Sequence, residues 1–119
     1  MKKGPENKNL KETIVFLEKT SKKNNSGIWK KVAEKISKPR RLHAQVNLGK
    51  ISRLTKPNDK IVVVGKVLGA GSLSHAVEIA SIAASEGTRG KVKKAGGKLV
   101  SIREMAEANP KGSGIVILQ

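Results

Sequence analysis

The residues best placed to do chemistry in this sequence are a run of cations, Lys38-Pro39-Arg40-Arg41, which passes into a short apolar alternation that ends at Ile51. Between residues 30 and 60 the chain carries ten Lys or Arg against two acids, so this quarter supplies +8 of the formal net charge of +16. Cations at this density neutralise the phosphates of a polyanion. We therefore expect these cations to contact nucleic acid: Lys30, Lys31, Lys35, Lys38, Arg40, Arg41, Lys50, Arg53 and Lys66.

Pro39 decides how the two arginines are presented. It fixes its own φ and biases Lys38 toward extended backbone, so the helical pattern before it should stop there. We predict a non-helical, basic RNA-binding strap over residues 38–44, which would display its side chains along a groove. The alternative is that Arg40 and Arg41 are a solvated surface pair after a helix.

A glycine-rich segment from Gly65 to Ser74 is the second candidate for phosphate chemistry, because it follows a run of β-branched residues. A dinucleotide fingerprint would need a third glycine where Ser74 stands and an acid about 20 residues further on. The Walker pattern is absent as well. A tight turn, or close backbone approach to RNA at Gly69 and Gly71, is therefore favoured, and a small nucleotide-binding enzyme remains the alternative.

The histidines do not assemble a catalytic constellation. His43 and His75 lie 32 residues apart, and no glycine elbow frames Ser72 or Ser74 beside His75. The absence of cysteine excludes disulfides, thiolate zinc sites and cysteine nucleophiles. We therefore expect no enzyme activity, no metal site, no cofactor and no small-molecule substrate.

The elements that must position the cations follow from periodicity. Helical spacing predicts a helix over 9–21 and a second that places Trp29 in its apolar stripe, which gives a helical pair over 9–37. Strands are predicted at 46–48, 61–64, 77–82, 98–100 and 115–118, with helices over 85–94 and from 101 to a stop at Asn109-Pro110. The predicted fold class is α/β: a helical pair, then a small mixed, mostly parallel sheet.

Length and composition set the remaining limits. The 119 residues make one domain, with a flexible basic tail over 1–8 and an α/β core over 45–119. No apolar run is longer than four residues, so we expect no membrane partner. Phe16 and Trp29 both lie in apolar helical stripes and supply no platform for unpaired bases. Contacts with phosphates and with the shape of folded RNA or duplex are therefore favoured.

The central stretch also resembles a known family. It is similar to the archaeal and eukaryotic large-subunit ribosomal protein eighteen-e, a relative of bacterial ribosomal protein fifteen, although Ile36 stands where that family often has leucine. Further similarity extends over nearly the whole chain, including the segment from Lys66 to Gly71. The matching central residues are Glu34, Ile36, Pro39, Arg40, His43, Ala44, Val46, Asn47, Leu48, Lys50 and Ile51.

This resemblance implies a structural protein of the cytoplasmic ribosome, with large-subunit ribosomal RNA and neighbouring large-subunit proteins as partners. It implies a fold of irregular strand-strand-helix turns, and the compact length resembles archaeal members. It also implies RNA contact at the motif positions Pro39, Arg40, His43, Asn47 and Lys50. Another basic nucleic-acid-binding protein, one that compacts DNA or binds transfer RNA, is the weaker alternative.

Overall fold

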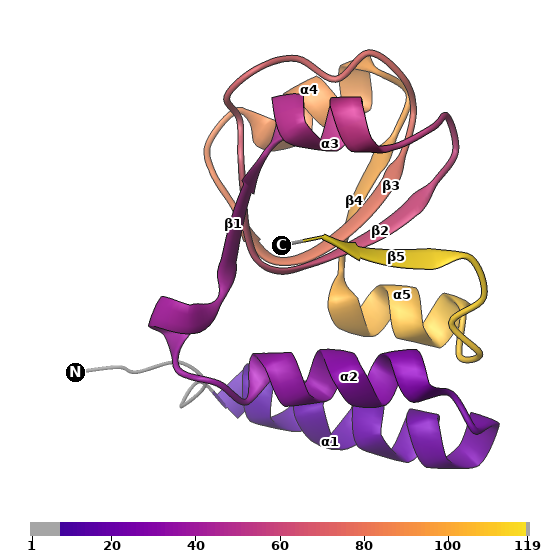
Figure 1. The fold of residues 1–119 in the computed structure, drawn as a ribbon. Helices are drawn as coiled ribbons and strands as arrows, with labels where there is room; N and C mark the ends of the chain where they lie inside the picture. Colours follow the sequence, from indigo (N-terminus) through magenta and orange to yellow (C-terminus); the bar gives the residue numbers. More distant parts are fainter. Residues whose placement is uncertain (1–7, 119) are drawn as a thin grey trace. The chain divides into compact units, whose positions relative to one another are not determined.

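The computed structural model describes residues 8–118, and their contacts group them into two compact units (Figure 1). The helical unit comprises residues 8–43 and 102–113, and the sheet unit comprises residues 44–101 and 114–118. The predicted basic tail over 1–8 lies outside the described residues except for Lys8, where the first helix begins. The C-terminal helix of the helical unit comes from the stretch that the sequence assigned to the α/β core.

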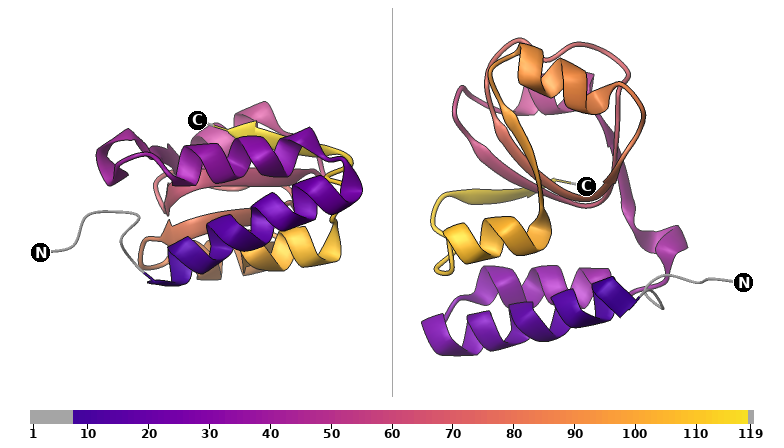
Figure 2. Two further views of the ribbon diagram at one scale, coloured as in Figure 1. Left: turned by 90° about the horizontal axis from the view of Figure 1, so that it is seen from below. Right: turned by 180° about the vertical axis from the view of Figure 1, so that it is seen from behind.

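The helical unit contains α1 (Lys8–Asn24), α2 (Gly27–Ile36) and α5 (Ile102–Ala108), and α1 packs against both other helices (Figure 2). Helix α1 runs three residues beyond its predicted end. It stops before Asn25, whose φ of 52° is left-handed backbone that an α-helix does not contain. The buried side chains of this unit include Leu17, Trp29, Val32, Ala33, Ile36, Ile102, Met105 and Ala106.

Trp29 is the largest buried side chain of the helical unit, and it joins segments that are far apart in the sequence. Its indole Nε1–H donates to the carbonyl of Asn109, with an N···O distance of 2.9 Å. Close by in sequence, the Ser26 hydroxyl donates to the carbonyl of Lys111 at 3.1 Å. These bonds fix the start of α2 to the loop that follows α5, so Trp29 has the core role expected from its apolar stripe.

The strap differs from its prediction in one respect. Residues Arg40–Leu42 form a single 3₁₀ turn, η1, in which the Leu42 N–H donates to the carbonyl of Pro39 at 2.9 Å. Proline prevents α2 from continuing, but its fixed φ suits the start of a new helical turn, and its missing N–H would have no partner there anyway. The predicted helix end is confirmed, whereas the prediction of a non-helical backbone throughout 38–44 is wrong at this turn.

The sheet unit contains five strands: β1 (Ala44–Asn47), β2 (Lys60–Leu68), β3 (Glu78–Ala84), β4 (Lys98–Ser101) and β5 (Ile115–Leu118). Every pairing among them is parallel, in the order β1-β2-β3-β4 with β5 also paired to β2. The first half of β2 pairs with β5 and its second half with β1. The predicted fold class is confirmed, with β2 at the centre of the sheet.

Strand β2 extends further than predicted. Ile61 to Val64 are all buried, as expected for a strand covered on both faces, but the strand continues through Gly65 to Leu68. Gly65 lies opposite Ala44 of β1, and a Cβ on Gly65 would collide with the Ala44 carbonyl. The segment predicted as a loop from Gly65 is therefore strand in its first part, and the glycine permits close approach of two backbones.

The core of the sheet unit is built mainly from β-branched residues of the strands, together with side chains of the two short helices α3 (Leu48–Leu54) and α4 (Thr88–Lys94). Helix α4 begins three residues later than predicted because Gly87, with φ 86°, adopts left-handed backbone. The predicted left-handed glycine cap at its end is confirmed at Gly96, whose φ is 87°. The core residues are Val46, Leu48, Ile51, Ile61, Val63, Val67, Val77, Ile79, Val92 and Leu118.

Strand β5 is present as predicted, but it is not fully buried. Val116 is 47% exposed, and only Leu118 of the four residues is buried. The alternation is that of a strand with one solvated side. Over residues 8–118, no helix has both the length and the apolar character that a membrane crossing requires.

Candidate nucleic-acid interface

The cations of α2 are outside because the apolar stripe of this helix is inside. Trp29, Val32, Ala33 and Ile36 are buried, and helical geometry turns the opposite side of α2 toward solvent. Lys30 and Lys31 are exposed, and Lys35 is half-buried. The helix therefore presents two fully solvated ammonium groups whose direction is set by the core beneath them.

The strap continues this positive surface within the helical unit. Lys38, Pro39 and Arg41 are exposed, and Arg40 opens the 3₁₀ turn. His43 closes the strap, since its Nε2 lies 3.1 Å from the carbonyl of Ile36, a contact that requires the Nε2–H tautomer or the imidazolium to donate. His43 thus ties the end of the strap to the last turn of α2, which gives this residue a structural use.

The sequence-predicted residues of the sheet unit lie on and around α3. The side-chain oxygen of Asn47 accepts from the N–H of Lys50 at 2.8 Å, so Asn47 is the N-cap of α3. Lys50 is half-buried and Arg53 is exposed. Lys66 is exposed on β2, where its register partners are Gln45 of β1 and Ala83 of β3.

The glycine loop after β2 is held by protein groups on both sides. The Gly69 N–H donates to the Ser85 hydroxyl at 2.9 Å, and the Gly49 N–H of α3 donates to the Ala70 carbonyl at 3.1 Å. Gly71 has φ 82°, and a Cβ there would lie 2.8 Å from the Cα of Gly49. Close backbone approach at this loop therefore occurs between the loop and α3. Contact of Gly69 and Gly71 with RNA stays a prediction.

Lys91 of α4 completes this arrangement, because its ammonium group donates to the carbonyls of Gly69 and Gly71 at 2.7 and 3.2 Å. A phosphate cradle presents backbone N–H groups to the anion. At this loop the N–H of Gly69 is bonded to Ser85, and two carbonyls point at a cation. The geometry is that of a loop locked onto its own unit.

His75 takes part in a hydrogen-bonded chain that pins the same loop to α3. Its Nε2 lies 2.9 Å from the Thr55 hydroxyl, which itself donates to the Ile51 carbonyl at 2.6 Å. Its Nδ1 lies 3.1 Å from the Ser74 hydroxyl, and that hydroxyl lies 2.8 Å from the hydroxyl of Ser52. The Thr55 hydrogen is committed to Ile51, so His75 donates from Nε2 to the Thr55 hydroxyl. These hydrogen bonds hold the loop against α3, and the group that orients His75 is the Thr55 hydroxyl instead of a carboxylate.

Sequence reasoning missed the cations of α4. Arg89, Lys91, Lys93 and Lys94 are all exposed on this helix. The sequence contains the pattern that indicates this basic helix, because residues 88–98 carry five cations and no acid. Counted over the whole chain, residues 1–43 and 102–113 have a net charge of +9, and residues 44–101 and 114–119 have +7. Positive charge is therefore a property of both units.

The described residues hold no group of three or more His, Cys, Asp or Glu side chains arranged to bind a metal ion. The polar side chains that converge in the sheet unit are hydroxyls, one imidazole and a lysine, and each has a bond to backbone or to another side chain. Such groups stabilise a loop. The solvated cations of α2, the strap and α4 are the groups that face outward.

Comparison with known proteins identifies what this chain is similar to. Residues 3–119 match the family described as "Ribosomal protein 60S L18 and 50S L18e". The large ribosomal subunit protein eL18 of Archaeoglobus fulgidus is 46% identical over 112 residues, which cover 94% of this chain and 96% of that protein. The eL18 protein of Methanoregula boonei is 40% identical over 113 residues, or 95% of this chain and 93% of the relative. That of Pyrobaculum aerophilum is 39% identical over 115 residues, or 97% and 94%.

Proposed function

This chain belongs to the family of ribosomal proteins 60S L18 and 50S L18e, and we propose from that premise that it is a structural constituent of the large ribosomal subunit that binds the subunit's RNA. Its place is the ribosome in the cytoplasm, with large-subunit RNA and neighbouring ribosomal proteins as partners. Its length matches that of archaeal relatives, whose chains it covers almost completely.

One observation carries the RNA-binding part of this proposal: exposed cations stand on a surface whose direction is fixed by a buried core. Lys30 and Lys31 point outward because Trp29 is buried, and Arg41 follows on a turn that His43 ties back to α2. The packed core fixes the backbone that carries these cations, so ordering on phosphate binding is limited to their side chains. The cations that we propose contact RNA are those of α2, the strap and α3 that the sequence indicated, together with Lys66.

The function is structural and not enzymatic. The loop that most resembled a nucleotide site has its Gly69 N–H bonded to Ser85 and two of its carbonyls bonded to Lys91. His75 is oriented by the Thr55 hydroxyl and lies next to the exposed Ser74, whereas a catalytic triad orients its histidine with a carboxylate. A protein that stabilises folded RNA needs no reacting group, cofactor or small-molecule substrate.

The proposal is tested by the salt dependence of binding to archaeal large-subunit ribosomal RNA. Each neutralised phosphate adds about 0.7 to 0.9 to the slope of log affinity against log salt. Replacing both Arg40 and Arg41 by alanine should lower that slope by about 1.5 to 2, as expected for the loss of two phosphate contacts. A salt-insensitive affinity, or an unchanged slope in this variant, would contradict the proposed interface.

A matched control removes two adjacent cations elsewhere in the helical unit. Lys22 and Lys23 are exposed in the last turn of α1 and lie outside the proposed interface. The Lys22→Ala, Lys23→Ala variant should keep the slope of the wild type. Crosslinking in cells, with identification of the bound nucleic acid, separates ribosomal RNA from DNA or transfer RNA as the partner.

A further inference from the structure

A groove on the helical unit lies outside the proposed interface. It has a volume of about 500 Å³ and runs between α1 and α5, which is within the range of small-molecule binding sites. Its floor is apolar, because Val15 is 49% exposed and Phe16 is only half-buried. The groove is lined by Lys11, Glu12, Val15, Phe16, Lys19 and Arg103.

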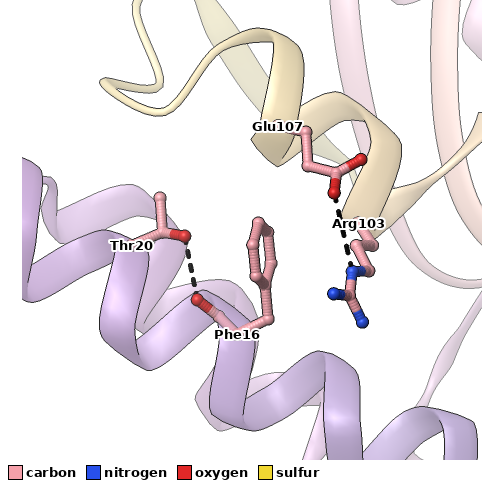
Figure 3. Close-up of polar contacts among 4 residues, drawn as sticks. All are labelled: Phe16, Thr20, Arg103 and Glu107. Atoms are coloured by element: carbon pink, nitrogen blue, oxygen red, sulfur yellow. Dashed lines mark hydrogen bonds and ion pairs between the residues drawn. The ribbon is translucent and has the colours of Figure 1, made fainter.

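The Arg103 guanidinium of α5 lies over the Phe16 ring of α1 at this groove (Figure 3). The guanidinium carbon lies 4.7 Å from the centre of the Phe16 ring, within the distance of a cation–π contact. Glu107, one turn further along α5, places its carboxylate 3.8 Å from Nε of Arg103. The Arg103 side chain is nevertheless 46% exposed, so a flat cationic surface is held over an aromatic ring and still meets solvent.

The rim determines which occupant fits. Three cations, Lys11, Lys19 and Arg103, surround the apolar floor against one lining acid, Glu12, and Arg103 is also paired with Glu107. This balance repels a basic protein segment and favours an occupant that is both planar and anionic at its edges. An unpaired nucleotide has this character, since bases stack on aromatic rings and on guanidinium planes while their phosphates pair with lysine.

We propose that this groove binds one unpaired nucleobase of the RNA, stacked on the Arg103–Phe16 pair, with Lys11 and Lys19 at its flanking phosphates. The inference rests on the proposed function, because it names a second mode of contact with the same RNA. It also changes the role of Phe16, which sequence analysis placed only in an apolar helical stripe. The helical unit then binds RNA both through phosphates and through one base.

The test uses the full chain and archaeal large-subunit ribosomal RNA. Arg103→Lys keeps the charge but removes the planar stacking surface, so we expect affinity to fall by about fivefold or more while the salt slope stays unchanged. Arg89→Lys is the matched control, because Arg89 is also an exposed arginine on a short helix and its Nη1 donates to the Leu99 carbonyl at 3.3 Å. It should bind like the wild type.

Phe16→Leu provides a second variant that keeps the groove apolar, and it should lose affinity to a similar extent. Ultraviolet crosslinking of the wild-type complex followed by mass spectrometry should place a single nucleotide on the peptide that contains Phe16 or Arg103.

Wild-type affinity in both variants, or a complex in which no nucleotide is crosslinked to the peptides that contain Phe16 and Arg103, would overturn the base site while leaving the proposed function standing. Failure of the wild type to bind this RNA at all would overturn the proposed function itself.

Discussion

The helical unit and the sheet unit are both strongly basic, but they hold their cations by different means. In the helical unit, a buried apolar stripe that contains Trp29 orients Lys30 and Lys31, and side-chain bonds to distant carbonyls fix the helices. In the sheet unit, β-branched strands form the core, and six of the ten cations lie on two short helices, α3 and α4, which both contact the glycine loop. Charge placement therefore depends on tertiary packing in one unit and on close backbone contact in the other.

This difference teaches that the number of cations in a stretch of sequence is an incomplete guide to where a cationic surface lies. Residues 30–60 carry the largest number of cations, yet Arg89, Lys91, Lys93 and Lys94 of α4 are exposed as well. Lys91 also shows that a surface lysine can serve its own unit, since it bonds two loop carbonyls. The two units should consequently respond differently to substitutions.

The largest effect is expected in the helical unit from Trp29→Ala. Loss of a fully buried indole leaves a cavity and an Asn109 carbonyl without its donor, which should lower the free energy of unfolding by about 3–5 kcal/mol. Urea unfolding measures this change, and Trp29→Phe should cost less because it refills part of the space.

Hydrogen exchange in the Trp29→Ala variant then tests the prediction that the chain is a single domain. If protection is lost in the helical unit while β2 keeps its own, the two units unfold separately and that prediction fails.

In the sheet unit the corresponding substitution is Gly65→Ala. A Cβ at this position collides with the Ala44 carbonyl, and two paired backbones cannot yield as a flexible side chain would. We expect a loss of about 3 kcal/mol in denaturant unfolding, at the upper end of overpacking effects. Gly90→Ala is the control, because no atom lies within 4 Å of its built Cβ and the site is helical. It should be neutral or stabilise by about 0.5–1 kcal/mol.

The comparison of charge is sharpened by a triple variant of α4. Replacing Arg89, Lys93 and Lys94 by glutamine removes three exposed cations without touching Lys91, which holds the loop. If α4 contacts phosphates, the salt slope for large-subunit ribosomal RNA should fall by about two. The Lys30→Gln, Lys31→Gln variant should lower it by about 1.5 on the same scale. A wild-type slope in the α4 variant would restrict the interface to the residues that sequence analysis identified.

The smallest effect is expected at Asn47, where an observed helix cap and a proposed RNA contact fall on one residue. Asn47→Ala removes the acceptor for the Lys50 N–H and should destabilise the chain by about 1 kcal/mol in thermal or denaturant unfolding. Asn47→Asp keeps the cap, so its stability should match the wild type. Its added negative charge should nevertheless weaken RNA binding if Asn47 faces phosphate. Equal RNA affinity in the aspartate variant would leave Asn47 with a capping role only.

Features set by local sequence could be predicted. The β-branched run at Ile61 identified the central strand, Gly96 identified the end of α4, and Asn109-Pro110 identified the end of α5. The buried stripe around Trp29 also placed Lys30 and Lys31 correctly on the outside of α2. These signals act through a residue's own backbone or through its neighbours within two helical turns.

Features set by distant partners could not be predicted. Gly65 looked like the start of a loop because the backbone of Ala44, which makes a glycine necessary there, is far away in the sequence. The grouping of α5 with α1 depends on packing that no periodicity reveals. The contact between the Arg103 guanidinium and the Phe16 ring also depends on this packing, so the sequence did not predict the groove. Pro39 had the correct local effect on α2, but it also allowed a new turn to start.

The parallel arrangement of the sheet has a consequence for the speed of folding. No strand in it meets a neighbour through a hairpin, and the first half of β2 pairs with residues as distant as Ile115 to Leu118. Each pairing must therefore close a long loop, at a cost in chain entropy, before its hydrogen bonds and buried side chains stabilise it. The relative contact order is high as a result, and we expect refolding to be slow, on the order of milliseconds to seconds. Helices α1 and α2, whose contacts are local, should form well before the strands assemble.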